Sequence, residues 1–197
     1  AYDNALKLRP SEYEVYWRRG ILDYQKGQLD SAIEEFKKAI TVYPDYPVGY
    51  NSLGIVYDLK GQYDLAIKSY QKAIALMPGY AEAYYNLGIS YENLNQLDEA
   101  ISSYNQAIKY NPDYAKAYNN LGNVYYKKGN FEKGIEYFKK AVSYAPQMIE
   151  AYNNLGTVYL EKKMYTQAAE MFKKVLEINP QDKEAKKNYR TALSAQK

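Results

Sequence analysis

Six of the seven prolines in this 197-residue chain are spaced 34 positions apart, and this period constrains the fold more than any other feature. They are Pro10, Pro44, Pro78, Pro112, Pro146 and Pro180. Glycines keep the same interval at Gly20, Gly54, Gly88, Gly122 and Gly156, and the hexapeptide AYNNLG at 117–122 recurs at 151–156. A fixed period of this length indicates a repeat architecture, in which each unit packs mainly against its neighbours.

Within one period, the apolar residues predict two helices joined by a tight turn. Between residues 115 and 146, Tyr118, Leu121 and Tyr125 recur at helical spacing. A second apolar set begins at Phe131 and ends before the next proline, which cannot continue a helix. One such hairpin cannot bury its own apolar face, so the hairpins must stack. The sequence therefore predicts an all-α fold.

These columns resemble the tetratricopeptide repeat family. Its pattern, Tyr-x-x-Leu-Gly-x-x-Tyr followed by Ala, an aromatic residue, Ala and Pro, runs through essentially the whole chain. The resemblance implies a right-handed superhelical solenoid of antiparallel helix hairpins. We expect a single domain over 1–197, made of a half repeat (1–10), five full repeats (11–44, 45–78, 79–112, 113–146 and 147–180) and a polar capping helix (181–197).

The composition excludes several classes of chemistry. The chain has no Cys and no His, so Ser-His-Asp and Cys-His sites, zinc sites built on these residues and disulfides cannot form. Its carboxylates are scattered over turns and helix exteriors, so we predict no enzymatic activity, no cofactor and no metal. The net charge is only +3, which predicts no nucleic-acid partner. No apolar run of about 20 residues is present that could span a membrane.

The two asparagines of AYNNLG need an explanation, because Asn is a mediocre helix former. In the resembled family the first helices of the hairpins line a concave groove, and this resemblance places the second Asn there. Aligned repeats give a ladder of Ser52, Asn86, Asn120 and Asn154, with Arg18 in the first repeat. An Asn amide offers a donor and an acceptor, which match those of one peptide unit. The ladder therefore predicts binding of an extended peptide backbone.

The ladder is similar to that in the tetratricopeptide arm of O-linked N-acetylglucosamine transferases, although the catalytic portion of those enzymes has no counterpart here. The predicted groove changes from apolar and aromatic to polar along the chain. It comprises Trp17, Arg18, Ile21, Tyr24, Asn51, Ser52, Ile55, Tyr85, Asn86, Ile89, Lys116, Asn119, Asn120, Asn123, Lys127, Asn153, Asn154 and Thr157. Trp17, the only tryptophan, is the expected energetic centre of binding.

The leading prediction is a scaffold that binds a segment of another protein, and two alternatives stay open for the groove. The asparagines could serve only as a solvated helix face. A carboxylate clamp of the co-chaperone type would instead hold the C-terminus of a partner. Asn86 and Lys116 suit such a clamp, but Asn51, Ile55 and Asn120 stand where the family pattern has Lys, Asn and Arg.

A third alternative is self-association through the N-terminal edge of the array. Residues 1–10 match the second half of a repeat, and Tyr2 and Leu6 would lie on an uncapped apolar face. Such a face would dock on further repeats or on a second copy.

Two further expectations concern side chains outside the core columns. Tyr24, Tyr85 and Tyr126 are the tyrosines left available for a ligand, since the others occupy packing positions. Arg19 and Asp23 are expected to form an ion pair across one helical turn.

Overall fold

The computed structural model describes residues 11–196, and every regular element in that part of the chain is an α-helix. The predicted all-α helical repeat fold is therefore confirmed. The helices are α2 (Glu12–Gln25), α3 (Leu29–Val42), α4 (Pro47–Leu59), α5 (Tyr63–Leu76), α6 (Ala81–Asn93), α7 (Leu97–Tyr110), α8 (Ala115–Lys127), α9 (Phe131–Tyr144), α10 (Ile149–Glu161), α11 (Tyr165–Ile178) and α12 (Lys183–Ser194). The predicted half repeat with Tyr2 and Leu6 lies outside the described residues.

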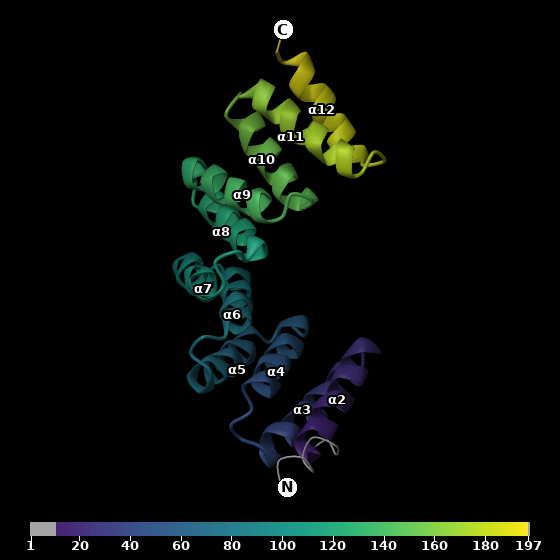
Figure 1. The fold of residues 1–197 in the computed structure, drawn as a ribbon, viewed down its shortest axis with the longest axis vertical. Coiled ribbons are helices and arrows are strands. Elements are labelled where there is room, and N and C mark those ends of the chain that lie inside the picture. The colour runs from purple at the N-terminus through teal and green to yellow at the C-terminus, as the bar shows by residue number, and fades with distance from the viewer. Residues whose placement is uncertain (1–10, 197) are drawn as a thin grey trace, which may run out of the picture. The chain divides into compact units, whose positions relative to one another are not determined.

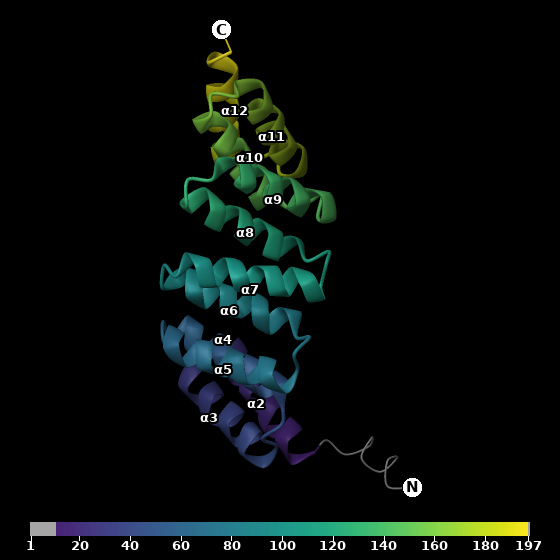
Figure 2. The same cartoon turned by 90° about the vertical axis from the view of Figure 1, so that its left-hand side faces the viewer.

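The helices gather into two compact units, an N-terminal unit up to Tyr110 and a C-terminal unit from Asn111. Within each unit, every helix packs on the next one in the chain (Figure 1). The first helices of consecutive hairpins also touch, namely α4 and α6 in one unit and α8 and α10 in the other (Figure 2). Among residues 11–196, no helix combines the length and the hydropathy that crossing a bilayer requires.

Each hairpin turn holds one residue in the left-handed conformation. The φ angles are 75° at Gly27, 70° at Gly61, 57° at Asn95, 75° at Gly129 and 58° at Lys163. In the first turn, Gln28 N–H donates to the Asp23 carbonyl and Gly27 N–H to the Tyr24 carbonyl, both at 2.9 Å. These two bonds form a Schellman motif, which ends the first helix and satisfies its last carbonyls. Glycine adopts this conformation without the cost of about 1–2 kcal/mol that a β-carbon adds.

In each hairpin, the periodic glycine of the first helix faces an aromatic ring of the second helix. A β-carbon on Gly122 would lie 2.7 Å from the ring of Phe138, which is buried. Gly54 and Tyr70 make the same contact in the N-terminal unit, where the distance would be 2.5 Å. Only glycine leaves room for the ring, so this contact sets the spacing of the helices and fixes the glycine period.

Asp58 connects three helices of the N-terminal unit. Its carboxylate accepts hydrogen bonds from the hydroxyls of Tyr70 on α5 and Ser90 on α6, both at 2.7 Å. Burial raises the pKa of Asp58 above its ordinary value of 3.8, although both hydroxyl donors oppose this shift. In the next hairpin, the Tyr104 hydroxyl donates to Glu92 at 2.9 Å.

The expected Arg19–Asp23 ion pair is wrong, because the Asp23 carboxylate instead accepts a hydrogen bond from the Ser31 hydroxyl at 2.8 Å. Ion pairs do join one hairpin to the next, as between Lys60 and Asp30. Lys162 and Glu132 repeat this pair in the C-terminal unit. Both carboxylates are exposed, so each pair contributes little to stability.

Replacing Gly122 by Ala should destabilise the C-terminal unit. Overpacking costs about 1–3 kcal/mol, whereas replacing Gly by Ala within a helix gains about 0.5–1 kcal/mol. We expect a net loss of about 1–2 kcal/mol, seen as a lower urea midpoint. The control is Gly79→Ala, whose β-carbon would lie 3.7 Å from the Tyr110 ring, an ordinary contact. Equal losses in both variants would contradict the close-approach argument.

The raised pKa of Asp58 predicts a pH dependence of stability. The folded state binds the Asp58 proton more tightly than the unfolded state does. Protonation of Asp58 therefore makes its full contribution to the free energy of unfolding below pH 3.8. It is lost as the pH rises through the higher folded pKa. The Asp58→Asn variant lacks this titration, so the stability of the parent relative to the variant should fall over that range. Urea midpoints of the parent and the variant at several pH values measure the difference, and a constant difference over the whole range would contradict this account.

Candidate functional site

A small apolar pocket lies between the first two hairpins, within the N-terminal unit. Its volume is about 80 Å³, and its lining residues are Ile21, Tyr24, Phe36, Ser52, Ile55 and Val56. Four of them, on α2 and α4, belong to the predicted groove, so the structure brings the N-terminal groove residues together. Phe36 and Val56 were not predicted as site residues, and helical spacing alone does not show that they line the pocket. Tyr24 is 38% exposed at this pocket.

Trp17 holds α2 against α4 beside this pocket. Its indole N–H donates to the Ser52 hydroxyl at 2.9 Å, and its ring meets the edge of Tyr46 at 6.3 Å between centroids. Burial raises the pKa of Tyr46 to about 12, so this hydroxyl stays neutral. The indole N–H of Trp17 is thus engaged in a hydrogen bond within the protein. The role of Trp17 as the energetic centre of binding stays a prediction.

The asparagines of the N-terminal unit form a network between first helices. Asn86 on α6 donates from its amide to the side-chain carbonyl of Asn51 on α4 at 3.1 Å. Asn51 in turn donates to the carboxylate of Glu82, in the first turn of α6, at 3.4 Å. Asn51 is only 3% exposed, so these contacts replace the water that its amide would otherwise need.

The same network recurs in the C-terminal unit. Asn154 on α10 donates to the side-chain carbonyl of Asn119 at 3.0 Å. Asn119 donates to the carboxylate of Glu150 at 2.8 Å, and it is 1% exposed. Its amide also approaches the side-chain oxygen of Asn120 at 3.5 Å.

This arrangement corrects the expectation that both asparagines of the pair face a ligand. Asn51 and Asn119 are buried and bonded within the protein, so neither can contact a visiting chain. Asn86 and Asn154 are half-buried, and each commits one amide hydrogen, which leaves a carbonyl oxygen and a second N–H. Glu82 and Glu150 were not predicted as site residues, although both stand 31 positions after their asparagine partners.

The tyrosines expected to be available for a ligand differ in their contacts. The Tyr126 hydroxyl donates to Glu161, a contact that raises the Tyr126 pKa. Tyr85 packs against the ring of Tyr104, with 6.0 Å between centroids. Tyr24, at the pocket, is therefore the best placed of the three.

The other predicted groove residues belong to neither network nor pocket. Ile89 and Asn123 are half-buried, whereas Arg18, Lys116 and Lys127 are exposed.

At the end of the array, the side-chain hydroxyl of Thr157 donates to the backbone carbonyl of Asn153 at 2.9 Å, and Thr157 is exposed. The side-chain oxygen of Asn153 is buried without a partner. Across residues 11–196, no cluster of three acidic side chains is arranged to hold a metal ion.

The stacked hairpins define a helical repeat protein, and comparison with known proteins identifies the family. The family model described as TPR repeat matches residues 22–59, 59–95 and 91–129, and the one described as tetratricopeptide repeat matches 113–181. The chain belongs to the tetratricopeptide repeat family. Proteins of this family generally mediate protein–protein interactions, and neither model describes a catalytic family.

Solved structures support the assignment. A crystal structure of MamA is 34% identical to this chain, with a TM-score of 0.75, and the match covers 84% of this chain and 96% of MamA. TTC0263, a thermophilic TPR protein of Thermus thermophilus, is 25% identical over 92% of this chain and 99% of its own, with a TM-score of 0.71. YrrB, described as a TPR protein with an unusual peptide-binding site, is 23% identical over 100% of this chain and 97% of its own, with a TM-score of 0.69, and shows the shared fold alone. No curated protein matches the chain significantly.

Replacing Asn119 by Ala should lower the stability of the C-terminal unit by about 1–3 kcal/mol, because it removes the two hydrogen bonds with Asn154 and Glu150, each worth about 0.5–1.5 kcal/mol. The urea midpoint of unfolding measures the loss. Asn123→Ala, on the same helix but outside the network, is the control and should not lower the midpoint, since Ala favours helix formation. An unchanged midpoint for the Asn119 variant would mean that the buried network contributes nothing.

Proposed function

We propose that the N-terminal unit binds an extended peptide segment of a partner protein on the face formed by α2, α4 and α6. The pocket between α2 and α4 carries this proposal. It is apolar and opens beside the exposed Tyr24, so it suits one apolar side chain of the peptide. Burying such a side chain stabilises a complex by about 1.5–3 kcal/mol.

Asn86 supplies the polar part of the proposed site. Its remaining carbonyl oxygen and amide hydrogen match the donor and acceptor of one peptide unit. Its other amide hydrogen is bound to Asn51, which fixes the orientation of the amide before a peptide arrives. Such preorganisation lowers the entropic cost of binding. The ladder of the sequence analysis is thus reduced in this unit to one oriented amide, and the likeness to the glycosyltransferase arm stays a prediction.

The carboxylate-clamp alternative has less support. Asn51 stands at one of the clamp positions, but it is buried and donates to Glu82. Ile55 stands at another and lines the apolar pocket, where a carboxylate would lose its hydration without a charged partner. A peptide with a free C-terminus and its amidated form should therefore bind equally well.

The proposal can be tested with a random-peptide selection against the whole chain. Enriched peptides should share one apolar residue. Ile55→Glu should weaken their binding by roughly tenfold or more, because it places a carboxylate against the apolar lining. Fluorescence polarisation measures the affinity, and circular dichroism checks that the variant folds.

Leu65→Glu is the matched control, since Leu65 lies on α5 outside the pocket and is exposed. This variant should keep the parent affinity. If the selected peptides bind the Ile55 variant as tightly as the parent, the pocket is not the anchor site.

A further inference from the structure

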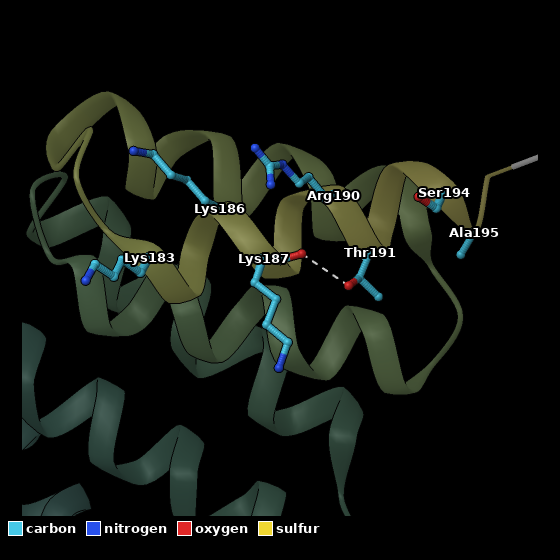
Figure 3. A pocket seen from close by; sticks show the side chains of 7 residues that line it. All are labelled: Lys183, Lys186, Lys187, Arg190, Thr191, Ser194 and Ala195. Atoms are coloured by element: carbon cyan, nitrogen blue, oxygen red, sulfur yellow. Dashed lines mark hydrogen bonds between the residues drawn. The ribbon is translucent and has the colours of Figure 1, made fainter.

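The C-terminal helix, α12, carries a basic stripe on one of its faces. Lys183, Lys186, Lys187 and Arg190 follow one another at intervals of three, one and three residues along α12, with Thr191 and Ser194 beyond them. Together with Ala195, they line one broad, open depression of about 770 Å³ (Figure 3). The opposite face of α12 is fixed, because Ala185 and Ala192 are fully buried.

Two of the four cations stand at repeat positions against which, in preceding repeats, the next helix packs. Arg190 follows Gly156 by 34 residues, and a β-carbon on Gly156 would lie 2.6 Å from the ring of Phe172 on α11. Lys186 stands in the column of Tyr152. Long cationic side chains at these two positions leave no room for a further apolar helix to pack there, and they present positive charge instead.

The helix dipole does not explain the first of these cations. Lys183 begins α12, where the helix dipole disfavours a positive charge. The first turn has its own stabilising partner, because the Asp182 carboxylate accepts a hydrogen bond from the Ala185 N–H at 2.9 Å.

The stripe also lacks counter-ions within the described part of the chain. Other lysines of the C-terminal unit have carboxylate partners, as Lys140 with Glu136 and Lys174 with Glu177. None of the four stripe cations has a carboxylate partner among residues 11–196, and Lys186 donates only to the side-chain oxygen of Gln181 at 3.4 Å.

We infer that this stripe binds an acidic segment of a partner protein. Residues 111–197 hold 15 basic and nine acidic residues, a net charge of +6, whereas residues 1–110 hold 11 and 14, a net charge of −3. The stripe runs from 183 to 194, a rise of about 16 Å, which suits a short cluster of carboxylates rather than a long polyanion. Arg190 can hold a carboxylate with two parallel N–H bonds, and the lysines add point charges.

The test uses the whole chain and a fluorescein-labelled peptide of alternating Glu and Ala pairs, with the Glu→Gln peptide as ligand control. Replacing all four stripe cations by Gln should weaken binding of the Glu peptide by roughly tenfold or more. Each exposed charge pair contributes less than tenfold to the affinity, but four are removed together. The matched variant replaces Lys133, Lys139, Lys163 and Lys173 by Gln, which removes the same charge from exposed sites outside α12.

The inference predicts that this matched variant binds within about twofold of the parent and that added salt weakens the parent complex. Equal losses in both variants would overturn it, because net charge alone would then explain binding. So would tighter binding of a single-stranded DNA of equal charge that depends on the same four residues, since the stripe would then serve nucleic acid. Circular dichroism and the urea midpoint confirm that both variants are folded.

Discussion

The close approach of glycine to an aromatic ring is the contact on which each hairpin depends. Gly122 lies against Phe138, and Gly54 lies against Tyr70, at distances that exclude a β-carbon. Because the ring fills the space between the helices, it sets their separation, and this separation allows the alanine columns to be fully buried. The left-handed turn residues then reverse the chain at a fixed point. The period of the glycines and aromatic residues is therefore set by the packing of the two helices.

Helix positions could be predicted from the sequence because packing imposes a period on apolar and small residues. The boundaries follow the prolines and the turn residues, whose conformational limits are local. Proline at 47 is outside the period, yet it stands at the first position of α4, where its missing N–H costs nothing. The chemistry of the site was less accessible. Asn119 has helical spacing typical of an exposed face, and its burial becomes visible only in the packing of α8 against α10, where it bonds Asn154 and Glu150.

Polar side chains were misjudged for one physical reason. An amide at an interface between helices can face solvent or another amide, and the spacing along its own helix is the same in both cases. Asn51 and Asn86 differ by one position in the repeat, but the first is a buried hub and the second keeps hydrogen-bonding capacity. The pocket beside Ile55 depends likewise on how α2 and α4 meet, since Phe36 contributes to it from α3.

The amide networks have a longer repeat than the helices do. Asn51 and Asn119 are 68 residues apart, which is two hairpins, and Tyr85 holds the intervening place. Each network joins the first helices of two consecutive hairpins within one unit. Inserting a single hairpin between Tyr110 and Asn111 would preserve every apolar column and would leave both networks intact, because each lies wholly within one unit.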